Sequence, residues 1–255
     1  MKKFSVFFII LLKFGILNIK ASDEPKPPKQ INWLFNGVTG KFDRQSIQRG
    51  FKVYKEVCSA CHSVKRLAFR NLMEIGFSED EVKALASEYE VKDVPNEEGE
   101  MFDRSARLTD MIPGPYPNEK AARASNNGAY PLDLSLIIKA RHDGANYVYS
   151  LLTGYSTPPK NFELGENMYY NPYFAAGGNQ LAMTPPLHTA DQVEFNDNTK
   201  ASIDQMSKDV VNFLQWVAEP EMEDSKSLGI KVIIFLLIFT VLFYIAKKRI
   251  WQRIK

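Results

Sequence analysis

The chain has 255 residues, of which 45% are hydrophobic and 12% aromatic, enough to bury one core of substantial size. Its formal net charge is only +2, and no run of Lys and Arg alternates with aromatic residues, which argues against nucleic-acid binding. We therefore expect one main folded domain and no nucleic-acid partner.

Residues 1–21 have the order of a secretory signal peptide. Two lysines precede an apolar stretch from Phe4 to Leu12, and small residues follow at the predicted cleavage site after Ala21. Lys13 and Lys20 disfavour the alternative, an uncleaved anchor helix. The start is also poor in the Arg and Ser of a mitochondrial presequence, so we expect export across a bacterial inner membrane.

A helix is predicted from Arg44 onward, because apolar residues recur at spacings of four, three and three, at Ile47, Phe51, Tyr54 and Val57. This helix leads directly into the segment "CSACH", residues 58–62, which contains both cysteines of the chain. The spacing places two thiols and one imidazole within about one turn.

Three kinds of site use a Cys pair at this spacing. A dithiol redox site leaves His62 unexplained, and a zinc site would need four ligands, which could come only from the two cysteines and two of His62, His142 and His188. Covalent haem attachment accounts for all three residues, with Cys58 and Cys61 bonded to the porphyrin vinyl groups and His62 beneath the iron. An exported chain with no other cysteine also offers no disulfide partner for the pair.

The stretch from Glu79 to Asp103 carries ten acidic and two basic side chains, a net charge of −8 on a nearly neutral protein. Charge runs of this kind are usually solvated surface, but they also steer charged partners. Short helices are expected at Glu79–Tyr89 and Leu134–Arg141. No convincing strand alternation is present between them.

The second axial ligand of the iron would decide what the haem does. The candidates are two histidines and seven methionines, His142, His188 and Met73, Met101, Met111, Met168, Met183, Met206 and Met222. Met206 is expected in the core, and Met222 lies close to the C-terminal apolar stretch. Met183, in "GGNQLAMTPPLH", is favoured because two glycines allow a tight turn before it and two prolines stiffen the chain after it.

A second amphipathic helix is predicted within residues 198–221, with one apolar face formed by Ile203, Met206, Val210, Phe213, Leu214 and Val217 and a stop at Pro220. We therefore expect an all-α domain with long loops. The apolar stretch Gly229–Ala246 would span about 27 Å as a helix and cross a membrane once. A basic cluster follows it, at Lys247, Lys248, Arg249, Arg253 and Lys255, which places residues 247–255 in the cytoplasm and residues 22–226 in the periplasm.

Several segments together resemble the cytochrome c1 family in sequence and in order. They are "RGFKVYKEVCSACHSV", "PNEEGEMFDR", "GPYPNEKAARASNNGAYPLDLS", "ARHDGANYVYSLLTGY", "MYYNPYF", "LAMTPPL" and "KDVVNFLQWVAEPE", followed by the apolar anchor. The resemblance implies a cytochrome c-like helical fold with one C-terminal transmembrane helix. It also implies one covalent haem c held by Cys58 and Cys61, with His62 as the proximal and Met183 as the distal ligand.

The resemblance further implies that Arg123 lies near a haem propionate. One departure is visible: the family usually has two prolines where this chain has Pro131 and Leu132, which puts the rigidity of that loop in doubt.

By the same resemblance, the chain is the electron-carrying subunit of the cytochrome bc1 complex and is not an enzyme on its own. It would take one electron from the Rieske iron–sulfur protein, beside cytochrome b, and pass it to a c-type cytochrome at the acidic stretch Glu79 to Asp103. The alternatives are an independent membrane-anchored cytochrome c serving a terminal oxidase, a haem enzyme or gas sensor with an open iron site, and a zinc-stapled module.

Overall fold

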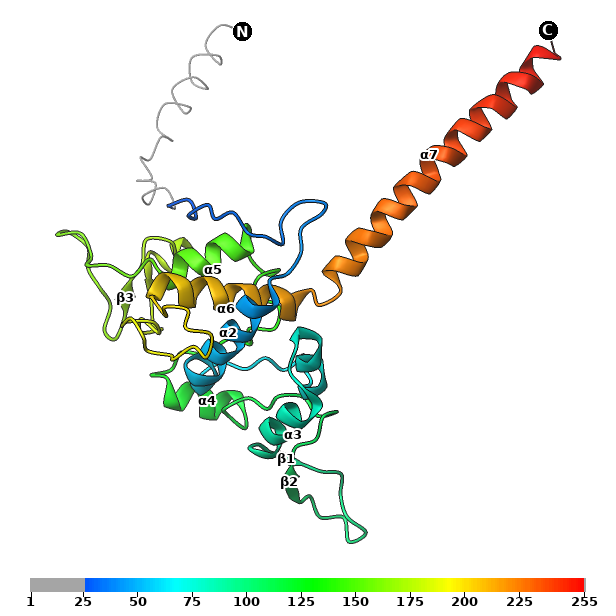
Figure 1. The fold of residues 1–255 in the computed structure, drawn as a ribbon. Coiled ribbons are helices and arrows are strands. Elements are labelled where there is room, and N and C mark those ends of the chain that lie inside the picture. The colour runs from blue at the N-terminus through cyan, green and yellow to red at the C-terminus, as the bar shows by residue number, and fades with distance from the viewer. Residues whose placement is uncertain (1–25, 255) are drawn as a thin grey trace, which may run out of the picture.

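The computed structural model describes residues 26–254, so the predicted signal peptide lies outside the described residues. The elements run in the order α2 (Arg44–Glu56), η1 (Cys58–Ala60), η2 (Phe69–Ile75), α3 (Glu79–Ser87), β1 (Glu90–Lys92), β2 (Asp103–Ser105), α4 (Glu119–Ser125), α5 (Gly144–Leu152), β3 (Tyr169–Tyr170), η3 (Ala175–Gly177), β4 (Gln180–Leu181), α6 (Ile203–Ala218) and α7 (Met222–Gln252). The domain is helical with long loops, as predicted. Figure 1 shows α7 leaving it as a single long helix.

Both predicted amphipathic helices are present and begin at side-chain caps. The Asp43 carboxylate accepts hydrogen bonds from the first turn of α2, and the Ser202 hydroxyl accepts one from Gln205 N of α6. The two helices make the largest interhelical contact in the domain. Phe213 of α6 packs against Phe51 and Tyr54 of α2, with ring centroids 5.6 Å apart in each pair.

The contact between α2 and α6 is unusually close at Gly50. A methyl group added at Gly50 would overlap the Asp209 carbonyl of α6. The Asp209 side chain is fully buried and is held by Arg49 Nε at 2.8 Å and by the Ser46 hydroxyl at 2.6 Å. A buried charge needs such partners, so this network and the glycine together set the register of the two helices.

The segment Leu134–Arg141, expected as a helix, is a series of turns instead. Its backbone hydrogen bonds mostly span three residues, as from Ile137 N to Leu134 O. Its N-terminal end is tied by Leu134 N to Ser63 O, 2.8 Å away, and the backbone of Ile138 in its middle packs closely against Gly144 at the start of α5. One long-range contact and one close contact with the next helix therefore override the local helical pattern.

The domain also contains four strands among residues 26–254, which the sequence did not indicate. They form two antiparallel pairs, β1 with β2 and β3 with β4, each only two or three residues long. Strands this short cannot display a convincing period of two. The β1–β2 hairpin and its connecting loop project from the domain at the end away from α7 (Figure 1).

Helix α7 has 31 residues, and its apolar window has a mean hydropathy of 2.7, with none of that window buried in the domain. This is the helix predicted to cross a membrane. It begins earlier than the predicted span, at Met222, whose side chain is buried in the domain core. The expected haem domain and anchor are thus joined by one continuous helix.

We predict that Gly50→Ala lowers the free energy of unfolding by about 1–3 kcal/mol, because the methyl group forces α2 away from α6. Gly229→Ala is the control, since an added methyl group there meets no atom within 4 Å. Urea unfolding of the two variants in detergent measures the difference. An unfolding midpoint of Gly50→Ala equal to that of the control would contradict the close approach.

Candidate functional site

The "CSACH" segment forms a tight turn at the C-terminal end of α2. Cys61 N and His62 N both donate to the Cys58 carbonyl, at 3.1 and 2.8 Å. The two thiols are unpaired and half-buried. As predicted, the turn brings both thiols and the imidazole together.

The environment of Cys58 disfavours a dithiol redox site. Burial, with a further contribution from Cys61, raises the pKa of Cys58 to about 12. Reactive cysteines of oxidoreductases instead have a lowered pKa, which keeps the thiolate available at neutral pH. A thiol that stays protonated at neutral pH is poorly suited to reversible dithiol exchange.

The imidazole of His62 is held in one tautomer by the backbone. Its Nδ1 lies 2.7 Å from the Leu132 carbonyl oxygen, which can only accept a hydrogen bond, so Nδ1 carries the proton. Burial lowers the pKa of His62, although the Leu132 carbonyl and Asp133 oppose this shift. The neutral ring thus has an unprotonated Nε2, the atom that binds a metal when Nδ1 is fixed in this way.

Asp133 clamps the chain around His62. Its carboxylate accepts hydrogen bonds from the Ser63 hydroxyl and from Lys65 N, both at 2.8 Å, and from Ser135 N at 3.1 Å. These bonds outweigh partial burial and keep the pKa of Asp133 below its usual range. The contact with His62 uses the backbone of Leu132, so a residue other than proline at this position still provides it.

Met183 lies on a separate loop that is also restrained. The Tyr155 hydroxyl donates to the Met183 carbonyl at 3.0 Å, and burial raises the pKa of Tyr155, so that it remains a donor. Gly178, before the loop, has φ of +67°, the left-handed conformation that glycine adopts without strain. Met183 itself is half-buried.

Arg123 lies in the last turn of α4 and is exposed. Its Nε and Nη2 bind Glu119 Oε1 at 2.8 and 2.7 Å, and its Nη1 donates to the Gly128 carbonyl at 3.0 Å. A role at a propionate would therefore require Arg123 to exchange Glu119 for another carboxylate.

Three of the other candidate ligands are placed less favourably. His142 and His188 are exposed, and Met206 is fully buried in the core, as expected. Among residues 26–254, no group of three or more His, Cys, Asp or Glu side chains is arranged to hold a metal ion. The zinc alternative thus has no ligand set in the described part of the chain.

The acidic stretch forms α3 and the β1–β2 hairpin with its loop. Four of its ten carboxylates are in ion pairs, Glu79 with Lys83, Glu88 with Lys55, Asp93 with Arg104 and Asp103 with Lys92. The other six form no ion pair with residues 26–254. Three of them, Glu97, Glu98 and Glu100, lie on the hairpin loop beside exposed Met101 and Phe102.

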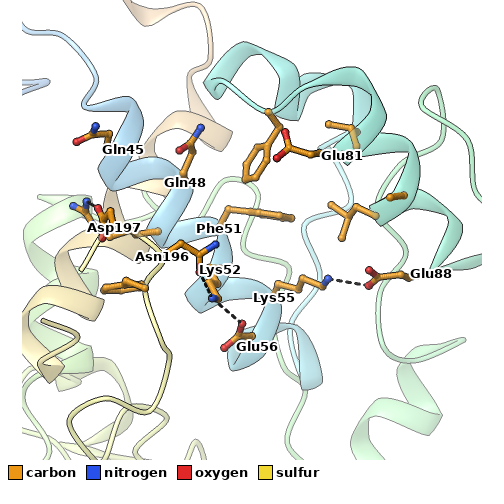
Figure 2. A pocket seen from close by; sticks show the side chains of 16 residues that line it. Gln45, Gln48, Phe51, Lys52, Lys55, Glu56, Glu81, Glu88, Asn196 and Asp197 are labelled. Carbon is orange, nitrogen blue, oxygen red and sulfur yellow. Dashed lines mark hydrogen bonds and ion pairs between the residues drawn. The ribbon is translucent and has the colours of Figure 1, made fainter. Parts of the chain in front are cut away.

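A hollow of about 520 Å³ lies beside the first part of this stretch, between α2, α3 and residues 195–197. Figure 2 shows Lys55 paired with Glu88 across it and Lys52 directed to Asn196 and Glu56. None of the residues predicted to bind haem lines this hollow, although Glu81 and Glu88 of the acidic stretch do. We assign it no role.

Two thiols and a neutral imidazole on one turn match the pattern that covalent attachment of a c-type haem uses. Together with the helical fold and the single apolar helix, they define a membrane-anchored c-type cytochrome. A model of the cytochrome c1 family matches residues 33–254, and the chain therefore belongs to this family. Proteins of the family carry one covalently bound c-type haem, which agrees with the spacing of Cys58 and Cys61.

Individual relatives support the same assignment. "Cytochrome c1, heme protein, mitochondrial" of Schizosaccharomyces pombe is 49% identical over 89% of this chain and 73% of its own length. "Cytochrome b-c1 complex catalytic subunit, mitochondrial" of Candida albicans is 48% identical over 92% of this chain and 81% of its own length. "Cytochrome b/c1" of Bradyrhizobium diazoefficiens is 45% identical over 93% of this chain, which spans 37% of that protein.

Three contributors to the site were missed from the sequence. They are the carbonyl of Leu132, the carboxylate of Asp133 and the hydroxyl of Tyr155. Each of them bonds to a residue at least 28 positions away in the chain, and no spacing rule signals such a contact.

We predict that Tyr155→Phe weakens the Met183 loop by about 1 kcal/mol, the usual net contribution of one hydrogen bond. The oxidised protein should then lose its Met-to-iron charge-transfer absorption at a lower urea concentration than the parent protein does. Tyr169→Phe is the control, because the Tyr169 hydroxyl forms no hydrogen bond with the described residues. Equal behaviour of both variants would argue against a restraining role for Tyr155.

Proposed function

We propose that this chain is the haem-bearing, electron-carrying subunit of a cytochrome bc1 complex. It takes one electron from a Rieske iron–sulfur subunit and passes it to a c-type cytochrome, and it assembles with cytochrome b. The family match over residues 33–254 and the names of the relatives support this proposal. On its own the chain is not an enzyme, since electron transfer of this kind needs no acid, base or nucleophile in the protein.

The residues of the site have separate tasks in this proposal. Cys58 and Cys61 hold haem c covalently, His62 is the proximal ligand, Met183 is the distal ligand, and Arg123 pairs with a propionate. The bound haem supplies a one-electron couple, and a thioether ligand raises its potential relative to a second imidazole. The observation that carries the assignment is the hydrogen bond from His62 Nδ1 to the Leu132 carbonyl. Because Nδ1 then holds the proton, Nε2 is unprotonated and can bind iron.

The chain's own groups keep the ligands in place. The Asp133 carboxylate holds the chain just after His62, at the Ser63 hydroxyl and Lys65 N, and the Tyr155 hydroxyl holds the backbone of Met183. Rigid ligands reduce rearrangement when the charge of the site changes by one electron. Fast electron transfer is favoured by this rigidity.

The proposed topology is a single-pass protein of a bacterial inner membrane. Residues 1–21 would be removed, residues 22–226 would face the periplasm, residues 229–246 would span the bilayer and residues 247–255 would lie in the cytoplasm. The unburied apolar window of α7 and the basic residues that follow it support this orientation.

The proposed acceptor site is the acidic stretch Glu79 to Asp103. Its unpaired carboxylates attract a basic cytochrome, and the exposed Met101 and Phe102 provide an apolar contact at the same place. Electrostatic attraction of this kind acts mainly on the rate of association and weakens with salt.

The test of the whole proposal uses the membrane fraction of cells that produce the chain. Haem staining after denaturing electrophoresis should label its band, and a reduced-minus-oxidised spectrum should show a sharp alpha peak. Co-purification with cytochrome b and a Rieske protein should follow. An unstained band would overturn the haem site, and a stained band that purifies alone would favour an independent cytochrome.

We predict that Met183→Leu retains covalent haem but loses the spectrum of a Met-ligated, low-spin iron, because leucine has no donor atom. Met168→Leu, at another half-buried methionine, is the control and should keep that spectrum. If the Met183→Leu protein kept it as well, Met183 would not be the ligand.

We predict that Glu97→Gln with Glu98→Gln slows association with a basic c-type cytochrome at low salt and flattens the dependence of its rate on ionic strength. Glu221→Gln with Asp224→Asn, beside the base of α7, removes the same charge and is the control. Stopped-flow reduction of the cytochrome measures both rates. An unchanged salt slope in the first variant would remove the hairpin loop from the docking surface.

A further inference from the structure

The loop from Leu34 to Lys41 exposes two large apolar side chains at its turns. The loop is closed by Lys41 N donating to the Leu34 carbonyl at 3.0 Å, and it contains turns over residues 33–36 and 37–40. Leu34 is 69% exposed and Val38 is 68% exposed, although their neighbours Trp33 and Phe35 are buried. Gly, Pro, Asn, Asp and Ser dominate at turns in water, whereas this loop exposes two branched apolar residues four positions apart.

The loop is fastened to the first turns of α7. Lys226 Nζ donates to the Phe35 carbonyl at 2.5 Å and also lies 3.4 Å from the Gly40 carbonyl. Just beyond the loop, Phe42 N donates to Glu223 Oε1 at 2.6 Å, and Arg44 forms an ion pair with Glu223 at 2.9 Å. In Figure 1 the loop lies beside the base of α7, on the side of the domain from which the helix leaves.

These contacts place the loop at the depth of lipid headgroups. The exposed apolar run of α7 begins at Leu228, two residues or about 3 Å beyond Lys226. The headgroup layer on each side of a bilayer is about 5–8 Å thick. A loop bonded to Lys226 therefore lies within or against this layer.

We propose that the 34–41 loop is a second membrane contact of this chain, in which Leu34 and Val38 enter the outer headgroup region of the bilayer beside α7. The ligand is the lipid surface itself, with apolar side chains at the acyl boundary and the exposed Lys41 within reach of lipid phosphates. Together, α7 and the 34–41 loop fix the tilt of the domain over the membrane. A single helix would leave this tilt free. The inference rests on the proposed membrane anchoring by α7.

The test places a nitroxide label on the loop in the haem-loaded, full-length protein. Cys58 and Cys61 are consumed by the haem, so Val38→Cys provides one free thiol. Val94→Cys, at another valine, 73% exposed on the distant hairpin loop, is the matched control, and Phe239→Cys reports on the middle of α7. Each protein is placed in vesicles of equal parts phosphatidylcholine and phosphatidylglycerol.

The measurement is the accessibility of each label to oxygen, which concentrates in lipid, and to a water-soluble nickel chelate. We expect the oxygen-to-nickel ratio at Val38 to be severalfold higher than at Val94 and lower than at Phe239. A ratio at Val38 equal to that at Val94, with Phe239 in lipid, overturns the loop contact alone. A water-like ratio at Phe239 overturns the membrane anchoring itself.

A further measurement separates lipid from a protein partner. In the purified complex, the label at Val38 should remain accessible to oxygen. Loss of accessibility to both oxygen and nickel would mean that another subunit covers the loop, and the lipid contact would be wrong for the assembled protein.

Discussion

The close approach of α2 and α6 at Gly50 is the constraint on which the rest of the structure depends. Without a side chain at this position, the α2 backbone rests directly on the Asp209 carbonyl, and the buried Asp209 carboxylate holds Arg49 and Ser46 beside it. This arrangement allows one register of the two helices. Because the "CSACH" turn continues directly from α2, the position of both thiols and of His62 is inherited from a contact more than one helical turn away.

The site itself is built mainly from backbone contacts between distant segments. Residues 132–135 hold the turn at His62 and Ser63, and Tyr155 holds the Met183 loop. In both places hydrogen bonds restrain the chain that carries a proposed ligand, and none of these bonds uses the proposed ligand atom itself. Such a design tolerates a change of side chain at Leu132, because only its carbonyl takes part.

Much of this structure could be predicted from the sequence where the signal is local. The spacing of Ile47, Phe51 and Tyr54 predicted α2, and the Cys-x-x-Cys-His spacing predicted the turn that follows it. The helix predicted at Leu134–Arg141 was wrong, because contacts with Ser63 and Gly144 outweigh the helical pattern of this segment. The short strands and the role of Asp133 depend on which distant residues meet, and one sequence carries little information about that.

The continuous start of α7 has a mechanical consequence. Met222 is buried in the domain, and Glu223 and Lys226 are bonded to the segment around residues 35–44, so no hinge separates the domain from its helix. The domain therefore cannot turn independently of its helix. In the proposed role, the electron donor and the electron acceptor must both come to the domain, and their own mobility then governs the rate of each transfer.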